Sequence, residues 1–87
     1  MADYRRYRVW KKGHELTLRT YRATKSFPND ERFGLTVQMR RSVSSIPTNI
    51  AEGFGRRGDK DRARFLDIAV GSANDFEYQL LLSKHLG

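Results

Sequence analysis

The sequence predicts an all-α protein, an antiparallel up-and-down bundle of three long helices at about residues 9–25, 35–54 and 60–86. Within these segments apolar residues recur three or four positions apart, which is the period of a helix with one buried face. Short stretches containing proline, glycine and asparagine join the segments, and short connections favour antiparallel neighbours. With 87 residues and no internal repeat, the chain is expected to form a single domain, residues 1–87.

The first predicted helix, at about residues 9–25, has only a rough apolar face. That face is expected to comprise Val9, Leu16, Tyr21 and Phe27, with Trp10 and Leu18 beside it. Pro28 disfavours helical dihedrals at the residue before it, so the helix should end before Phe27. Asn29 and Asp30 favour a turn, and we expect Phe27 and Phe33 to dock back onto the bundle.

The second predicted helix, at about residues 35–54, has the clearest pattern. Its apolar stripe is spaced 4, 4, 3, 4 and 4 residues apart and comprises Leu35, Met39, Val43, Ile46, Ile50 and Phe54. Pro47 lies inside this helix without shifting the stripe, which predicts a kinked helix. Proline cannot donate to the carbonyl of Val43 and costs about 3 kcal/mol or more inside a helix, so packing on both sides must offset it. The alternative is two short helices, the second capped by Ser44 or Ser45.

Glycines mark the connection between the second and third helices. Gly53, Gly55 and Gly58 are expected to supply left-handed conformations for a helix C-cap and a turn. Asp59 is expected to be the N-cap of the third helix. Asp61 falls in the first turn of that helix, where a negative charge interacts favourably with the positive end of the helix dipole.

The third predicted helix, at about residues 60–86, has a second apolar stripe. It comprises Phe65, Ala69, Ser72, Phe76 and Leu80, with Leu66 and Ala73 on its flanks. Glycine inside a helix costs roughly 1 kcal/mol relative to alanine, so Gly71 predicts that another backbone passes close by.

A polar stripe lies beside the apolar one on the second helix. Its members are spaced 3, 4, 4, 3 and 4 residues apart and comprise Gln38, Arg41, Ser45, Asn49, Glu52 and Arg56. The short side chains of Ser45 and Asn49 at its centre favour a half-buried interface, because their hydroxyl and amide groups suit fixed partners. A solvated face and a ligand site are the alternatives. Glu52 and Arg56 are placed for an ion pair.

Positive charge is concentrated at the start of the chain. The net charge is +7, and residues 1–25 contribute eight Lys and Arg against two carboxylates, 8 − 2 = +6. Such an excess of positive charge favours a polyanionic partner, of which nucleic acid is the first candidate. The alternative is that the basic helix only aids solubility. Two clusters supply the candidate nucleic-acid-binding residues: Arg5, Arg6, Arg8, Lys11 and Lys12, then Arg56, Arg57, Lys60, Arg62 and Arg64.

Three aromatic residues are interleaved with the first basic cluster. Tyr4, Tyr7 and Trp10 stand among the arginines, an arrangement in which rings can stack on unpaired bases while the charges follow the backbone. The alternative is that the rings pack on the bundle and the arginines only solvate it.

Other classes of function lack a motif. The absence of cysteine excludes disulfides and thiolate metal sites, and neither His14 nor His85 belongs to a metal-binding or nucleophile motif. We therefore expect no catalytic residues, no metal and no cofactor, and predict that the protein is not an enzyme. The start of the chain has no apolar signal region, and no run approaches the roughly 20 apolar residues that span a bilayer, so a cytoplasmic protein is expected.

Longer motifs carry a family resemblance over about residues 9–87. The run "GLTVQMRRSVSSIPTNIAEGFGRR", the later "RFLDIAVGSANDFEYQL" and the earlier "ELTLRTYRATKSFPNDERFGL" resemble the bacterial four-helix bundle proteins encoded in intervening sequences of 23S ribosomal RNA genes. The resemblance implies a helical bundle with Pro47 inside the second helix and assembly into a homo-oligomeric ring, commonly a pentamer. It implies no established enzymatic activity. Similar accessory proteins of retroelements bind a reverse transcriptase and nucleic acid through a basic surface.

The resemblance also implies a fourth helix. The sequence ends at "KHLG", where the connection to that helix would begin, and it leaves open whether the helix is truncated, disordered or lost. Three amphipathic helices without it would expose an apolar groove beside the first and third helices, and we expect another copy or a swapped segment to cover that groove.

These observations favour a non-enzymatic, self-assembling bundle that binds RNA or DNA through a basic surface, which a ring would repeat as a belt around its axis. The alternative function is a protein-interaction scaffold that docks a partner such as a reverse transcriptase.

Overall fold

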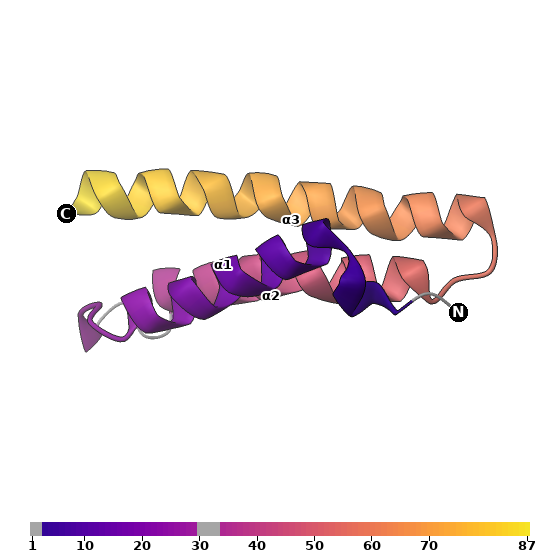
Figure 1. Cartoon of the computed structure of the whole chain (residues 1–87). Helices are drawn as coiled ribbons and strands as arrows, with labels where there is room; N and C mark the ends of the chain where they lie inside the picture. The colour runs from indigo at the N-terminus through magenta and orange to yellow at the C-terminus, as the bar shows by residue number, and fades with distance from the viewer. Residues whose placement is uncertain (1–2, 30–33) are drawn as a thin grey trace.

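The computed structural model describes residues 3–29 and 34–87, and in these ranges the chain is helical without strands. A short 3-10 helix, η1 (Tyr4–Arg6), precedes three long helices: α1 (Arg8–Thr24), α2 (Leu35–Phe54) and α3 (Asp59–Leu86). Successive long helices run in opposite directions, so that the N-terminus and the α2–α3 connection lie at the same end of the molecule (Figure 1). The predicted all-α helical bundle is confirmed.

The central helix is α2. It packs against α1 on one side and α3 on another, whereas no Cα atom of residues 8–24 lies within 8 Å of one in residues 59–86. A cluster at the α2–α3 contact forms the core, with Leu35, Met39 and Val43 from α2 and Phe76 from α3. Phe27, Ile46 and Leu82 pack against this cluster, as predicted for Phe27, while Phe33 and Asp30 lie outside the described residues.

The inner face of α1 differs from the predicted one. Val9, Leu16, Leu18 and Tyr21 are each at least 38% exposed, and the buried positions are Gly13, Thr20 and Thr24. Small side chains let two helices approach closely, and a threonine hydroxyl in a helix can bond within its own helix. Thr20 Oγ1 donates to the carbonyl of Leu16 at 2.8 Å and Thr24 Oγ1 to that of Thr20 at 2.7 Å, so both can be buried without losing a partner.

Helix α2 passes through Pro47 as one element, which makes the alternative of two short helices wrong. Ser44 Oγ donates back to the carbonyl of Arg40 at 2.7 Å and caps nothing. Gly13 of α1 faces the proline, because a Cβ on Gly13 would lie 3.5 Å from Pro47 Cδ and 3.3 Å from Ile46 Cγ2. A bend at Pro47 stays a prediction.

A hydroxyl from α1 compensates for the missing N–H of Pro47. The carbonyl of Val43 would accept from residue 47 in a regular helix, and it accepts instead from Thr17 Oγ1 at 3.2 Å. The same hydroxyl lies 2.8 Å from the carbonyl of Gly13, so its single proton is shared between two acceptors. The side chain of Val43 is 0% exposed, which leaves its carbonyl little access to water.

The glycines near the α2–α3 connection act differently from the prediction. Among the described residues only Gly87 has a positive φ, so Gly53, Gly55 and Gly58 adopt no left-handed conformation. Gly53 is buried instead, where an added Cβ would lie 3.3 Å from Phe65 Cβ and 3.4 Å from the carbonyl of Arg62. Gly58, not Asp59, is the N-cap of α3.

Helix α3 packs along one face only. Ala69 and Phe76 are buried and Phe65 and Ser72 half-buried, as the predicted stripe requires, but Leu80 is 45% exposed. The predicted close backbone at Gly71 is wrong, since an added Cβ would meet nothing within 4 Å. Further apolar side chains of α3 are exposed: Leu66, Ile68, Val70, Tyr78, Leu81 and Leu86.

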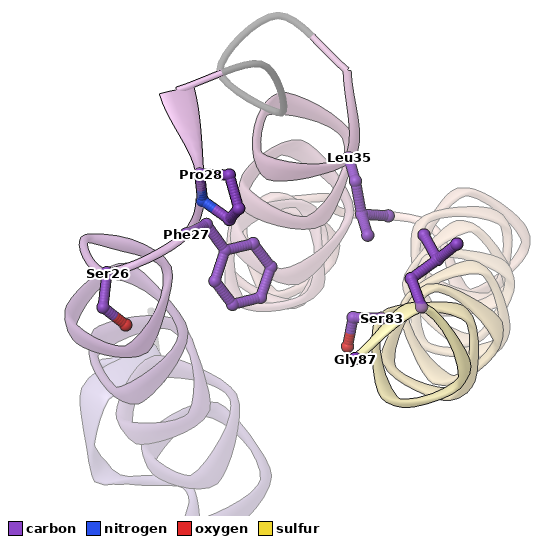
Figure 2. A pocket seen from close by; sticks show the side chains of 7 residues that line it. Ser26, Phe27, Pro28, Leu35, Ser83 and Gly87 are labelled. Carbon is purple, nitrogen blue, oxygen red and sulfur yellow. The ribbon is translucent and has the colours of Figure 1, made fainter.

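The end of the bundle opposite the N-terminus contains a pocket between the end of α1, the start of α2 and the end of α3. Phe27 and Leu35 point into this space (Figure 2). Its two serines bond to their own helices, Ser26 Oγ to the carbonyl of Ala23 at 3.0 Å and Ser83 Oγ to that of Leu80 at 2.8 Å. The pocket is therefore walled mainly by apolar groups.

Candidate nucleic-acid interface

The two basic clusters, far apart in the sequence, lie at the same end of the bundle (Figure 1). The segment before α1 packs on the end of α2, where the rings of Tyr7 and Phe54 stack with centroids 4.4 Å apart. Tyr4 lines a shallow hollow together with Glu52, Gly55 and Arg56. We call the combined surface the basic end; its members are Arg5, Arg6, Arg8, Lys11, Lys12, Arg56, Arg57, Lys60, Arg62 and Arg64.

Carboxylates of the chain engage three members of the basic end. Arg5 Nε lies 3.0 Å from Asp3 Oδ1, and the hydrogen bonds from Arg5 hold the pKa of Asp3 below its ordinary value. Arg56 Nη2 lies 3.1 Å from Glu52 Oε2, the ion pair that the spacing predicted. Arg62 lies 3.7 Å from Asp59 and its Nε donates to the carbonyl of Arg56 at 3.1 Å.

The other members of the basic end make no ion pair within residues 3–29 and 34–87. Arg6, Arg8, Lys11, Lys12, Arg57, Lys60 and Arg64 are all exposed. Arg64 lies over the ring of Phe65 at 5.2 Å from its centroid, and Arg56 lies over the same ring at 4.6 Å. The surface therefore keeps an excess of solvated cations after its internal pairs are formed.

The aromatic residues of this end contact other rings of the protein. Trp10 stacks on His14 with centroids 4.9 Å apart, and Tyr4 meets the edge of Trp10 at 5.2 Å. Tyr7 is stacked on Phe54. Each of these rings therefore packs against another ring of the protein, while Tyr7 stays 41% exposed, and the stacking of bases on them stays a prediction.

The polar stripe of α2 divides into a central and two outer parts. Ser45 and Asn49 are half-buried; Ser72 Oγ of α3 donates to Ser45 Oγ at 2.8 Å, and Asn49 Nδ2 donates to the same oxygen at 2.8 Å. Close by, Ser42 Oγ donates to Gln79 Oε1 at 2.5 Å. The outer members, Gln38, Arg41, Glu52 and Arg56, are exposed. The centre of the stripe thus faces α3 of the same chain.

Several basic residues that the sequence reasoning passed over acquire a place in the structure. Arg40 joins α2 to the end of α1, because its Nε donates to Thr24 Oγ1 at 2.9 Å and its guanidinium lies 4.6 Å from the ring centroid of Tyr21. Arg19 and Arg22 are exposed on α1 and continue the basic residues of its first turns. Their spacing from Arg8 and Lys12 was the available signal.

The described residues also bear on metal binding and on membrane insertion. In the described part of the chain, histidine and carboxylate side chains form no group of three or more that could bind a metal ion. The described helices include none with the length and hydropathy needed to cross a bilayer.

Comparison with known proteins places the chain in a family. No curated protein shows a significant similarity to the sequence. The family model of the 23S rRNA-intervening sequence protein matches residues 5–87, nearly the whole chain. The match covers all three long helices and both basic clusters, and the chain belongs to the 23S rRNA-intervening sequence protein family.

Proposed function

We propose that the protein binds nucleic acid through the basic end, by contacts to phosphates and without a catalytic step. The observation that carries this proposal is the meeting of the two basic clusters at one end, where exposed cations exceed the carboxylates that pair with them. Cations of this kind bind phosphate backbones with little dependence on base sequence. The family's name is the reason to test ribosomal RNA first.

Fluorescence anisotropy with a labelled ribosomal RNA hairpin and a labelled DNA, at 50 and 200 mM salt, tests this function. Each phosphate contact contributes about 0.9 to the slope of log K against log salt, so a surface of several contacts should lose affinity steeply. Replacing Arg6, Arg8, Lys11 and Lys12 by glutamine should weaken binding and flatten the slope. The control is Lys84→Gln, an exposed lysine near the far end of α3.

Two outcomes contradict the proposal. No binding at 50 mM salt dismisses the function. Binding that is indifferent to salt dismisses the mechanism, since counterion release would then contribute nothing.

A second proposal concerns self-association, and the exposed apolar residues between α1 and α3 favour it. Leu16 and Ala23 of α1 and Leu80 of α3 line a groove whose floor includes Met39 and Phe76. We call this the α1–α3 groove. Another copy of the chain, or a segment swapped from it, would bury these side chains, and repetition of the basic end in such an assembly would multiply weak phosphate contacts. Light scattering at micromolar concentration tests this, and a monodisperse monomer would contradict it.

A further inference from the structure

Cations extend well beyond the basic end along the outer face of α1. Arg8, Lys11, Lys12, Arg19 and Arg22 are exposed, and we call them the α1 row. Their spacing places them on one side of the helix, opposite the face of Gly13, Thr20 and Thr24 that is buried against α2. At 1.5 Å per residue, the 17 residues of α1 span about 25 Å.

The α1 row carries little opposing charge. Glu15 is the carboxylate on α1, and within the described residues it makes no ion pair with the row. Its single negative charge offsets only one of the cations around it. A strip of net positive charge therefore runs from the basic end toward the middle of the molecule and past it.

The backbone beneath the row is held in place along its length. Gly13 abuts Pro47, Thr17 Oγ1 donates to the carbonyl of Val43, and Arg40 donates to Thr24 Oγ1. These contacts anchor α1 to α2 near its start, its middle and its end. The cations of the row are thus carried on a helix that is anchored to α2 along its length.

The aromatic side chains at the same end are engaged with other rings of the protein, although Tyr7 stays 41% exposed, so less ring surface is open to unpaired bases. Single strands are bound mainly by stacking of bases on aromatic side chains beside a positive groove. Here Tyr7 is stacked on Phe54, and Trp10 is stacked on His14 with Tyr4 against its edge.

We propose that the α1 row, continuous with the basic end, takes the phosphate backbone of a double helix, RNA or DNA, in preference to a single strand. A duplex carries one phosphate charge per about 1.7 Å of axis, so about 25 Å of it presents roughly 15 charges along a stiff rod. A row of cations on an anchored helix can follow such a rod without first ordering a flexible nucleic-acid chain. This inference rests on the proposed nucleic-acid function and names the class of nucleic acid.

The test compares the binding of three labelled probes by fluorescence anisotropy. The probes are an RNA duplex of about 20 base pairs, a DNA duplex of the same sequence, and one strand of that DNA duplex alone. The duplexes should bind at least about tenfold more tightly than the strand, because duplex phosphates contribute steeper counterion release than single-strand ones. Equal affinities for the two duplexes would show that the protein contacts the phosphate backbone that both share. A much higher affinity for the RNA duplex would assign the contact to its A-form shape and 2′-hydroxyls.

The double variant Arg19→Gln/Arg22→Gln removes the two members of the α1 row that lie outside the basic end. Because Arg19 also lines the α1–α3 groove, light scattering of the variant checks that its mass in solution is unchanged. Loss of two phosphate contacts should reduce the salt slope for duplex by about 1.8 and weaken binding at 0.1 M salt by up to about 60-fold. The matched control is Arg41→Gln/Lys84→Gln, which removes the same charge from exposed positions outside both surfaces. Circular dichroism of each variant confirms that the helices are retained.

The outcomes separate the two proposals. If no probe binds at low salt, the proposed function fails. If the single strand binds as tightly as the duplexes and Arg19→Gln/Arg22→Gln behaves like its control, the function stands and the duplex inference is overturned. Strong quenching of the single tryptophan, Trp10, by the strand would overturn it as well, since that would show bases stacking at this end.

Discussion

The hydroxyl of Thr17 lies where the structure most needs a donor. Pro47 removes one hydrogen bond from the interior of α2, and an unpaired buried carbonyl costs about 1–3 kcal/mol. Thr17 Oγ1 reaches the carbonyl of Val43 at 3.2 Å because Gly13, one turn earlier, lets α1 approach α2 at the proline. Gly13 and Thr17 of α1 therefore act together to accommodate Pro47 of α2.

This coupling predicts a non-additive pair of substitutions. Thr17→Val keeps the shape of the side chain and leaves the carbonyl of Val43 without a donor, so it should cost about 1–3 kcal/mol. In a Pro47→Ala background, the backbone N–H of the introduced alanine can donate to that carbonyl, and the cost of Thr17→Val should fall below about 1 kcal/mol. Urea unfolding of the four proteins measures the coupling. Equal costs of Thr17→Val in the two backgrounds would show that Thr17 and Pro47 act independently.

At the scale of elements, α2 is covered along two sides while α1 and α3 are each covered along one. This explains why α2 follows the apolar periodicity most faithfully, with Leu35, Met39, Val43 and Ile50 all buried. The polar stripe fits the same picture: Ser45 bonds to Ser72 across the α2–α3 contact, and the ends of the stripe are in solvent.

The unequal packing of the helices predicts opposite effects for two Gly→Ala substitutions. Gly71→Ala gains helix propensity in open space and should stabilise the fold by about 0.5–1 kcal/mol, raising Tm by about 2–8 °C. Gly13→Ala gains the same propensity but places a Cβ 3.3 Å from Ile46 Cγ2, so we expect no gain or a loss. Thermal unfolding followed by circular dichroism compares them. A larger stabilisation from Gly13→Ala than from Gly71→Ala would show that the α1–α2 contact is loose.

For the molecule as a whole, the separation of α1 and α3 leaves the α1–α3 groove exposed along a body that extends 43 × 21 × 18 Å. Of the α1 row and the basic end, Arg19 lines the groove, while the other members are not among its lining residues. The helices α1 and α3 that flank the groove are seen in Figure 1. Self-association through the groove would therefore leave the cations other than Arg19 free for nucleic acid.

Charges placed in the groove should disrupt an assembly formed through it. Leu16→Glu and Leu80→Glu, at 38% and 45% exposed positions, should each reduce the mass in solution, because a carboxylate is costly to bury in an apolar contact. Ile68→Glu is the matched control, since Ile68 is 43% exposed and does not line the groove. Light scattering at equal concentrations gives the masses. Loss of assembly by the control alone would move the interface to the other side of α3.

Local patterns in the sequence were sufficient for the helical class, the apolar stripe of α2, the place of Pro47 and the Glu52–Arg56 pair. These features depend on residues three or four positions apart, whose proximity follows from helix geometry alone. Hydrophobic periodicity did not predict the inner face of α1, because threonine is classed as a polar residue. Thr20 and Thr24 can nevertheless be buried, since their hydroxyls donate to carbonyls of their own helix.

Long-range packing settled the rest. It placed Tyr4 beside Arg56 and stacked Tyr7 on Phe54 and Trp10 on His14. It also placed the close contacts at Gly13 and Gly53, and not at Gly71. Such proximities depend on the path of the chain between distant segments, about which the spacing of neighbouring residues carries no information. The residue types alone thus predicted that the candidate surface is basic, whereas its shape and extent depend on how the three helices pack.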